Sequence, residues 1–426
     1  MERYDSYKDS GVKWLGEIPS HWEVRKAKYL WRESFATSEN GSEELLSVSQ
    51  YEGVTPSKGE SRSESLKGYK IVSENDLVIN IMLAWLGGLG VSKCNGIVSP
   101  AYCIYKMIGD YSPRFLHYLY KTPLYLAEFA RHSTGVVPSR WRMYTDDFGQ
   151  VLTLLPPRKE QDSIVAYLDS ATSKIDKAIA QQQKMIDLLN ERKQIIINNA
   201  VTKGLDPNAP MKDSGVEWIG EIPEHWEVRK LKSITSKIGS GVTPRGGGAI
   251  YVDNGVMFMR SQNIYFEGFK LNDVAYITED LDSTMPNTHV QEGDILFNIT
   301  GGSIGRCRYV PEGFPKANVN QHVSIIRPKG FSTKYLYYLL RSRICQLQVD
   351  LQQTGGNREG LTAFALKNFY LPIPSEKEQE AIISYLDEID VKLQRLIDNS
   401  NNQISLLQER KQIIINDVVT GKVKVV

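Results

Sequence analysis

Short runs of apolar residues bounded by turn-forming residues mark two separate stretches of the chain. The first stretch holds "DLVINIMLAWLGGLG" and "GIVSPAYCIYKM", and the second holds "GVMFMRSQNI", "GDILFNITGG" and "HVSIIRPKG". Apolar runs of this length between glycines are typical of buried strands. Helices are expected after them, in residues 112–132 and 332–353. Both stretches are therefore predicted to be mixed domains of strands and helices.

Each predicted domain is followed by a long segment with helix signals. Ser375 and Glu378 form a capping box at the start of the second segment, and the pair Pro156-Pro157 suits the first turn of the first segment. Apolar residues then recur at heptad spacing in both segments. The two seams run through Leu168, Ile175, Gln182, Leu189 and Ile196, and through Leu386, Leu393, Ser400, Leu407 and Ile414.

Polar residues interrupt both seams at matching places. Gln182 corresponds to Ser400, and on the flank Lys193 corresponds to Lys411. Polar residues in a coiled-coil seam set register and partner choice, so the match favours pairing of the two helices with each other. The alternative is that each helix is simply amphipathic and lies on its own domain.

The ends of the two halves are nearly the same sequence. "DSGVKWLGEIPSHWEVRKAK" starts at Asp9 and returns 204 positions later as "DSGVEWIGEIPEHWEVRKLK". Likewise "KEQDSIVAYLDS" returns 218 positions later as "KEQEAIISYLDE". A repeat of this size fixes the architecture. Because one helix carries the chain to the second domain and the other carries it back, the pair is predicted to be antiparallel, on the order of 60 Å long.

These patterns predict an α+β fold class. Two mixed α/β domains are separated by two long antiparallel coiled-coil helices, with a pseudo-two-fold axis that follows from the internal repeat. The expected boundaries are 1–155 for the first domain, 156–204 for the first helix, 205–212 for a linker, 213–373 for the second domain and 374–422 for the second helix.

Composition narrows the compartment and the kind of partner. The net charge is +1, so any binding to nucleic acid must rest on a locally basic surface. The four cysteines form no CxxC pair, which favours a reducing compartment and argues against a structural zinc. The first residues are too polar for a signal peptide, and the longest uncharged run, 77–91, is too short to span a membrane. We expect a cytoplasmic protein without membrane contact.

No catalytic motif is complete in this sequence. "SPAY" at 99–102 lacks the amide and the second proline of a methyltransferase tetrapeptide, and "GGSIG" at 301–305 does not match the dinucleotide fingerprint. A phosphate-binding GxxxxGK[ST] motif is absent from the sequence. His21 and His225 stand in the two copies of "HWEVRK", where packing is the better interpretation. The chain is expected to bind without catalysing a reaction, and to hold no metal or cofactor itself.

Polar positions at constant spacing suggest what is bound. Pairs 218 apart in the divergent domains are Asp76 with Asp294, Asn80 with Asn298, and Arg140 with Arg358. Arginine in a glycine-containing loop can donate to phosphates or guanine, and Gln and Asn suit adenine edges. The alternatives are that the arginines pair with local carboxylates and that the amides cap strand ends. The candidate DNA contacts are Ser49, Gln50, Tyr51, Asn80, Arg140, Arg142, Arg260, Gln262, Asn263, Asn298, Thr300, Ser303, Gln321, His322, Asn357 and Arg358.

Several motifs resemble the specificity subunits of type I restriction–modification enzymes. They are "GDILFNITGGSIGR", "NVNQHVSIIRPK" and "LPIPSEKEQEAIISYLDE" in the second half, and "NDLVINIMLAWLGGLG", "GIVSPAYCIY" and "LLPPRKEQDSIVAYLD" in the first. The resemblance covers essentially the whole chain. It implies two target recognition domains that each read one half of a split double-stranded DNA site, with helices that set the spacer between the half-sites.

The resemblance also implies partners and their cofactors. The partners are two modification subunits, which hold S-adenosylmethionine and methylate adenine, and restriction subunits that use ATP and Mg²⁺. Where the second half has "GGSIG" the first has "WLGGLG", so the two domains are expected to read different bases. Two other interpretations stay open: a specificity subunit of another restriction or defence system, and a coiled-coil scaffold whose domains bind protein.

Overall fold

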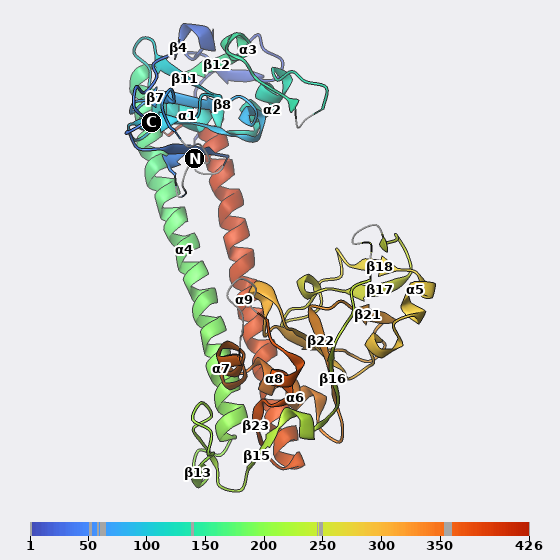
Figure 1. Ribbon diagram of the computed structural model, residues 1–426. Coiled ribbons are helices and arrows are strands. Elements are labelled where there is room, and N and C mark those ends of the chain that lie inside the picture. Colours follow the sequence, from blue (N-terminus) through green and yellow to red (C-terminus); the bar gives the residue numbers. More distant parts are fainter. Residues whose placement is uncertain are drawn as a thin grey trace. The chain divides into compact units, whose positions relative to one another are not determined.

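The computed structural model describes residues 2–50, 53–57, 59, 65–137, 140–244, 246, 250–352 and 360–425 (Figure 1). The chain folds into two compact units, Met1–Gln183 with Asn401–Val426, and Lys184–Ser400. The long helices are shared between the units. Helix α4 (Arg158–Lys203) begins in the first unit and ends in the second, and α9 (Glu376–Val419) begins in the second and ends in the first.

The first unit is built on a four-stranded antiparallel sheet of order β4-β11-β8-β9. All four residues of β8 are buried, as the apolar run predicts. Its core also takes in the apolar faces of the three short helices. The strands are β1 Tyr7–Asp9, β2 Glu17–Pro19, β3 Glu23–Lys26, β4 Trp31–Ser34, β5 Leu46–Ser49, β6 Gly53–Pro56, β7 Lys70–Val72, β8 Leu77–Asn80, β9 Leu89–Val91, β10 Gly96–Val98, β11 Tyr102–Met107 and β12 Leu152–Leu155, and the helices are α1 Pro113–Tyr120, α2 Pro123–Arg131 and α3 Thr145–Gln150.

The second unit has a corresponding four-stranded sheet of order β16-β22-β19-β20 and a further three-stranded sheet of order β18-β17-β21. In the further sheet, β17 and β21 run parallel. The strands are β13 Met211–Asp213, β14 Glu221–Pro223, β15 Glu227–Lys230, β16 Thr235–Ser240, β17 Val256–Met259, β18 Ala275–Ile277, β19 Ile295–Asn298, β20 Cys307–Tyr309, β21 Ala317–Val319, β22 Val323–Pro328 and β23 Tyr370–Ile373, and the helices are α5 Glu279–Ser283, α6 Thr333–Arg341, α7 Arg343–Gln352 and α8 Ala363–Lys367.

The two domains share a fold although their sequences differ. Strands β8 and β19 follow the same hydrogen-bonded turn, although the turn residues differ. The Ser73 N–H donates to Asp76 Oδ2 at 2.8 Å, and the Gln291 N–H donates to Asp294 Oδ2 at 2.7 Å. The constant spacing of these two aspartates therefore marks a shared turn that starts the β8–β9 hairpin and the β19–β20 hairpin.

The repeated "HW" pair fastens each domain to the start of its long helix. Trp226 Nε1 donates to Glu378 Oε1 at 3.1 Å, and His225 Nε2 lies 2.8 Å from the same oxygen. The corresponding tryptophan and histidine of the first unit contact the carboxylate of Glu160 at 3.0 and 2.8 Å. These contacts support the packing interpretation of the two histidines.

The two long helices contact each other within each unit. In the first unit, Lys411 Nζ donates to Asp176 Oδ1 at 2.6 Å. In the second unit, Lys193 Nζ lies 2.6 Å from Asp390 Oδ1. The predicted pairing of the helices is confirmed, and both lysines that interrupt the apolar flank are partners in ion pairs between α4 and α9.

The start of α9 is as expected, and one position of the α4 seam is not. Ser375 N–H donates to Glu378 Oε2 at 3.1 Å and Ser375 Oγ accepts from the Glu378 N–H at 3.4 Å, which confirms the capping box. Ile197 is buried, whereas Ile196 is partly exposed. A straight helix drifts relative to a strict seven-residue repeat, so the buried position moves by one. No helix in the described ranges is both long and apolar enough to cross a bilayer.

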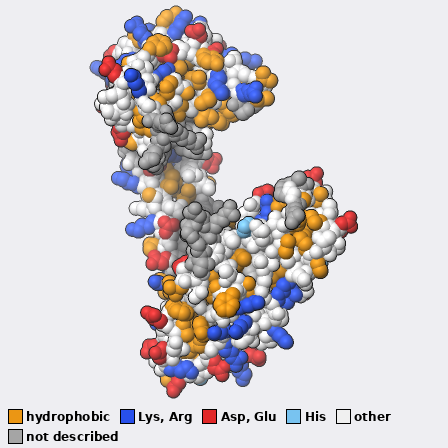
Figure 2. All heavy atoms as spheres, in the orientation of Figure 1, with side chains coloured by type: hydrophobic (Ala, Val, Ile, Leu, Met, Phe, Trp, Pro, Cys, Tyr) orange, Lys and Arg blue, Asp and Glu red, His pale blue; other side chains and the backbone are white. Residues whose placement is uncertain are grey.

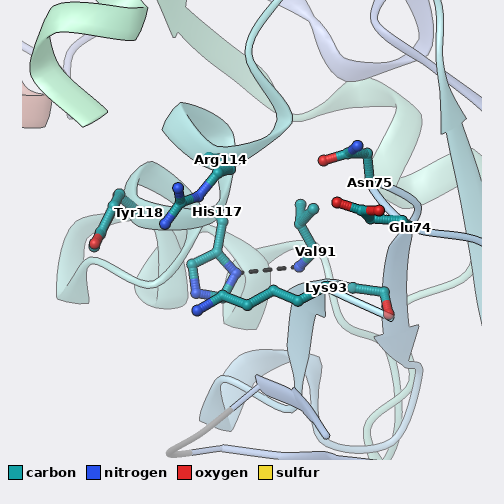
Figure 3. Close-up of a pocket in the computed structure, with 8 residues that line it drawn as sticks. Glu74, Asn75, Val91, Lys93, Arg114, His117 and Tyr118 are labelled. Carbon is teal, nitrogen blue, oxygen red and sulfur yellow. Dashed lines mark hydrogen bonds between the residues drawn. The ribbon is translucent and has the colours of Figure 1, made fainter. Parts of the chain in front are cut away.

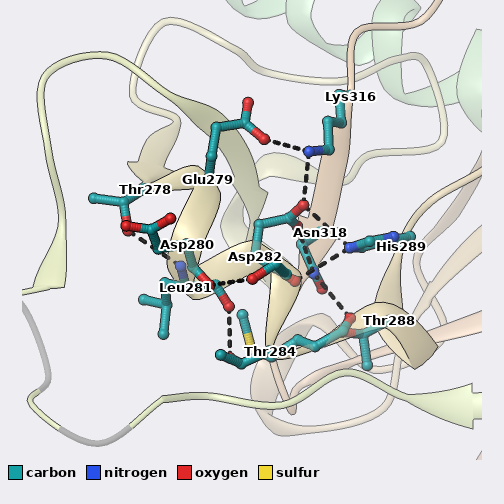
Figure 4. Close-up of polar contacts among 12 residues, drawn as sticks. Thr278, Glu279, Asp280, Leu281, Asp282, Thr284, Thr288, His289, Lys316 and Asn318 are labelled. Carbon is teal, nitrogen blue, oxygen red and sulfur yellow. Dashed lines mark hydrogen bonds and ion pairs between the residues drawn. The ribbon is translucent and has the colours of Figure 1, made fainter.

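A buried polar network holds α5 against the three-stranded sheet of the second unit (Figure 4). Asp282 accepts a hydrogen bond from Asn318 Nδ2 at 2.9 Å and faces Lys316 Nζ at 3.0 Å and His289 Nε2 at 3.1 Å. Lys316 also pairs with Glu279. Burial opposes ionisation of Asp282, but the contacts with Asn318 and Lys316 outweigh it and lower the pKa of this carboxyl. Asp282 and Asn318 are buried in this network, whereas Lys316 and Glu279 are exposed. No sequence signal predicted the network.

Candidate nucleic-acid interface

The end of β19 in the second unit gathers several of the predicted site residues. Asn298 closes the strand, and its Nδ2 donates to the Ser261 carbonyl at 2.9 Å and to Ser303 Oγ at 3.2 Å. Thr300 Oγ1 lies 2.6 Å from His322 Nδ1. Three segments that are distant in sequence therefore meet here: the end of β17, the β19–β20 loop and the start of β22.

The side chains of this cluster differ in burial: some are buried and hold the loops, and others are exposed to solvent. Asn298 is 0% exposed, so it holds the loop and cannot itself reach a base. Gln321 is exposed, and its backbone N–H donates to Thr243 Oγ1 at 3.3 Å. Its side-chain Nε2 lies 3.5 Å from His322 Nε2. The amide of Gln321 is therefore placed at the surface in the turn between β21 and β22, which the contact of Thr300 with His322 joins to the loop that Asn298 braces.

Arg260, Gln262 and Asn263 gather around Asp273 in the same unit. Asn263 is 1% exposed, and its Oδ1 accepts from the Arg260 N–H at 3.0 Å, so it caps the strand end as the alternative interpretation proposed. Arg260 Nη2 donates to the Asp273 carbonyl at 2.9 Å, and its guanidinium lies 5.5 Å from the ring centre of Tyr251. Gln262 Nε2 donates to Asp273 Oδ2 at 3.0 Å. Any contact of these two side chains with DNA has to compete with Asp273.

The corresponding strand end in the first unit is also braced by an asparagine. Asn80 is 4% exposed, and its Oδ1 accepts from the Met82 N–H at 3.0 Å. Its side chain also bonds Tyr102, whose pKa is raised by burial. Ser49 ends β5, and Gln50 follows it with an exposed side chain. As in the second unit, the asparagine supports the loop and a glutamine is presented at the surface.

A loop after α2 carries the two arginines predicted for the first domain. Arg140 is exposed, and Arg142 is half-buried with Nη1 donating to the Trp141 carbonyl at 2.8 Å. The rings of Trp141 and Trp85 pack edge to face, with centroids 5.2 Å apart. Because Trp85 belongs to the β8–β9 connection, this contact joins the arginine loop to the strand end that Asn80 braces.

Three of the predicted contacts lie outside the described residues: Tyr51, Asn357 and Arg358. The proposed correspondence between Arg140 and Arg358 is therefore placed in the fold for Arg140 alone. The described neighbour Gly360 pairs with Thr300, which brings the segment after Arg358 to the β19–β20 loop.

Sequence reasoning missed an apolar surface on the β8–β9 connection. Met82, Leu83 and Leu86 are 36%, 41% and 41% exposed. Figure 2 shows hydrophobic side chains interleaved with basic ones on the visible face of this unit. The signal was present in "INIMLAWLGG", where the apolar run continues past the end of the strand, but it was interpreted as buried strand and turn.

An aromatic residue flanked by cations was also missed in the second unit. The Tyr265 ring has Lys270 Nζ at 4.1 Å and the Arg306 guanidinium at 4.9 Å from its centre. Arg306 directly follows "GGSIG", so a basic residue after a glycine loop was the available signal. In the part of the chain that the structure describes, no three His, Cys, Asp or Glu side chains are grouped as they would be around a metal ion.

Known proteins with similar sequences are specificity subunits of type I restriction enzymes. Residues 223–406 match the family model of the type I restriction modification DNA specificity domain. The chain is 29% identical over 286 residues to the type I restriction enzyme MjaVIII specificity subunit of Methanocaldococcus jannaschii, covering 65% of this chain and 63% of that one. It is 23% identical over 455 residues to the protein assigned as the MjaX specificity subunit of the same organism, covering 98% of each.

A solved structure shares the fold along the chain. A chain from a type I restriction–modification system, whose structure was described for complex assembly and conformational transition, aligns with a TM-score of 0.68 and 14% identity. The alignment covers 94% of this chain and 98% of that chain. The family-model match lies in the second half of the duplicated sequence, and the alignment to the MjaX specificity subunit covers 98% of the chain and so spans both halves. The chain is therefore similar to type I restriction–modification specificity subunits, by the family-model match in its second half and by these relatives along its length.

Proposed function

We propose that the chain recognises DNA for a type I restriction–modification complex. Residues 1–155 and 213–373 each contact one half of a bipartite, asymmetric double-stranded site. The observation that carries this proposal is one fold present twice with different loop chemistry. The β8–β9 connection exposes Leu83 and Leu86, whereas the β19–β20 loop holds Thr300 and Ser303. Two scaffolds of the same fold with unlike loops suit two unlike half-sites.

The candidate contacts divide by exposure. The groups that can reach a base or phosphate are Gln50, Arg140, Arg142, Arg260, Gln262, Thr300, Ser303, Gln321 and His322, together with Ser49 at the end of its strand. Asn80, Asn263 and Asn298 are buried supports of the loops. Tyr51, Asn357 and Arg358 stay in the proposal on their sequence positions. Gln and Arg side chains can bond base edges bidentately, which is the chemistry that sequence discrimination needs.

In this proposal, the long helices bind the partner subunits. The beginnings and ends of the two helices are nearly the same sequence, so they offer like surfaces to two identical modification subunits, and the helices set the spacer between the half-sites. S-adenosylmethionine belongs to those modification subunits, and ATP with Mg²⁺ belongs to the restriction subunits. This chain contributes DNA recognition and assembly, and adenine methylation and cleavage are carried out by its partners.

Methylome sequencing tests the proposal most directly. We compare a host that carries the chain, a host that lacks it, and a host whose chain has residues 1–155 exchanged for those of a relative. The expected result is adenine methylation at a bipartite site in the first host and none at that site in the second. In the third host, one half-site changes and the other stays the same.

Two outcomes contradict the proposal. Methylation that is the same with and without the chain would show that the chain does not direct a methyltransferase. A change in both half-sites after the exchange would show that the two domains do not act independently.

A further inference from the structure

The side chain of Lys121, at the C-terminal end of α1, connects two loops of the first recognition domain. Its Nζ lies 2.7 Å from the Gln50 carbonyl oxygen, 2.8 Å from that of Gly87 and 3.4 Å from that of Leu89. A lysine ammonium has three N–H donors and no acceptor, so these carbonyls use all three. The Gln50 carbonyl belongs to the turn after β5, the Gly87 carbonyl to the β8–β9 connection, and the Leu89 carbonyl to the first residue of β9.

His117, one helical turn earlier, makes a second link to the same hairpins (Figure 3). Its Nδ1 accepts a hydrogen bond from the Val91 N–H at 3.1 Å. The ring also packs closely on both hairpins: a Cβ at Gly53 would lie 3.2 Å from its Cε1, and one at Gly90 would lie 3.3 Å away. Burial, and then nearby cations that include Lys121, lower the pKa of His117 to about 4, so the ring is neutral and can accept.

The charge on Lys121 is set by its surroundings. Burial lowers its pKa to about 8, within reach of physiological conditions. The titratable groups that share its cavity are His117 and Tyr118 of α1 and Lys411 of α9. Lys411 is paired with Asp176 at 2.6 Å. The hydrogen-bond acceptors of the Lys121 ammonium are the three carbonyl oxygens.

The second domain uses the corresponding position differently. Arg341 ends α6 as Lys121 ends α1, and the tyrosine three positions before each contacts a long helix through Asp387 or Asp169. Arg341 Nη1 donates to Tyr337 Oη at 2.9 Å and lies 3.6 Å from Asp390 of α9. In the second domain, the cation at this position is Arg341, which faces α9. In the first domain it is Lys121, which contacts the hairpins instead.

We propose that Lys121, assisted by His117, is a positioning residue for DNA recognition by the first domain. By binding carbonyls of both loops, it holds the turn that carries Gln50 against the connection that follows Asn80, so that the loops meet DNA as one surface. The inference rests on the proposed function of the domain for its effect on DNA. The brace itself is a property of the free protein.

Amide hydrogen exchange on the full-length chain tests the brace without DNA. We compare the native chain with Lys121→Met and with Lys13→Met, a control at an exposed lysine of the same unit. Lys121→Met should accelerate exchange by about ten-fold or more in residues 49–54 and 87–91, because the loops lose charge-assisted hydrogen bonds. The second unit and the control should not change. Unaltered exchange in both loops overturns the brace.

Selection from randomised duplexes, followed by sequencing, tests the effect on recognition. Lys121→Met should weaken preference at one half-site, with about ten-fold lower affinity, and leave the other half-site unchanged. Native binding to that half-site should fall as the pH rises from about 7 to about 9, because Lys121 loses its charge across its pKa of about 8. Lys121→Arg keeps a cation and should lose this pH dependence while retaining part of the affinity.

The two experiments separate the possible failures. A pH profile and a selected sequence that are the same in the native chain and in Lys121→Met overturn the positioning role. A native chain that selects no sequence contradicts the proposed DNA function, and the hydrogen-exchange comparison then decides the brace alone.

Discussion

At the scale of single residues, the contact between Trp226, His225 and Glu378 explains why the sequence repeats so strictly around "HWE". Burial opposes ionisation of Glu378, but hydrogen bonds from His225, Trp226 and Ser375 outweigh it and hold its pKa at about 2. The carboxylate is a common acceptor for the domain and for the first turn of α9. Any neutral replacement loses a charge-assisted acceptor for several donors at once.

Replacing Glu378 with Gln should therefore destabilise the second unit in a pH-dependent way. The folded pKa of about 2 lies below the ordinary value of 4.5, so the stabilisation is present above about pH 4.5 and is lost as the pH falls toward 2. Partial exposure of Glu378 screens the interaction, and we expect a loss of about 1 kcal/mol at neutral pH. Urea unfolding across this pH range should show the difference between the two proteins shrinking in acid. Glu376→Gln, at an exposed neighbour, is the control, and an equal loss there would contradict the explanation.

The exposed apolar side chains of the first domain lead to a second prediction at this scale. Met82, Leu83 and Leu86 stand where the second domain has a glycine-rich polar loop. Apolar side chains in a major groove distinguish thymine by its C5-methyl group. Replacing thymines by deoxyuridine in the half-site of the first domain should weaken binding by about 1 kcal/mol for each contacted methyl.

The same replacement in the other half-site is the matched control and should have little effect. Leu83→Ser should remove the sensitivity to deoxyuridine in the first half-site. If both half-sites respond alike, or neither responds, the apolar surface does not contact thymine and is available to a protein partner instead.

Residue types could be predicted from the sequence better than their roles. Asn80, Asn263 and Asn298 have side chains suited to adenine, and the same side chains suit the capping of strand ends. Burial decides between these roles, and burial depends on which loops pack over the strand end. Gln50 and Gln321 have the same chemistry and are exposed. The sequence could not separate the two groups because the deciding contacts come from distant segments.

At the scale of elements, the ion pairs between α4 and α9 differ between the units. Lys193 is 3% exposed and pairs with Asp390, which also lies 3.6 Å from Arg341. Asp390 therefore faces two buried cations. The pair of Lys411 with Asp176 in the first unit is more open, with side-chain exposures of 28% and 55%. An aspartate that pairs with two buried cations should contribute more to the free energy of unfolding than either cation contributes alone.

Removing Asp390 should therefore cost more stability than removing its partner. Asp390→Ala leaves Lys193 and Arg341 without this acceptor, and we expect a loss of about 2–3 kcal/mol. Lys193→Met leaves Asp390 with Arg341 and should cost about 1 kcal/mol. Lys411→Met, at the exposed pair, should cost less than about 1 kcal/mol. Chemical denaturation of the full-length variants measures all three, and equal losses in the first two would argue against a shared acceptor.

Helices and strands could be predicted where apolar residues form a continuous run or recur at a regular spacing. The apolar runs of β8, β11, β19 and β22 and the heptads of α4 and α9 are all present as helices and strands. The likeness of the two sheets was visible only in the constant spacing of Asp76 with Asp294 and of Asn80 with Asn298, because burial requires only apolar character between them: β8 is "LVIN" and β19 is "ILFN". The sheet of β17, β18 and β21 was missed because β18 and β21 have only three residues each, too few to show an alternation.

At the scale of the whole molecule, the helices belong to both units, and each unit contains an ion pair between them. Asp176 and Lys411 pair in the first unit, and Lys193 and Asp390 pair in the second. Asp176 precedes residue 187 and Lys411 follows residue 405, whereas the second pair lies between these positions in sequence. Residues added to α4 after Asp187 and to α9 after Ser405 therefore leave both pairs intact.

This arrangement makes the proposed control of spacer length testable. Four residues inserted after Asp187 and four after Ser405 add roughly 6 Å, slightly more than one turn, to each helix. That length corresponds to slightly less than two base pairs at roughly 3.4 Å each. The methylome of a host with the lengthened chain should show both half-sites unchanged and a spacer longer by one or two base pairs.

Insertion into one helix alone is the control that separates length from disruption. With four residues after Asp187 only, the pairs Asp176–Lys411 and Lys193–Asp390 require registers that differ by about 6 Å, so they cannot form together. That variant should lose stability and methylation instead of gaining a new spacer. A lengthened chain with both insertions that methylates the original spacer at full activity would show that the helix pair does not set the distance. The loss of all methylation in both variants, with folding intact, would place the determinant in the partner subunits.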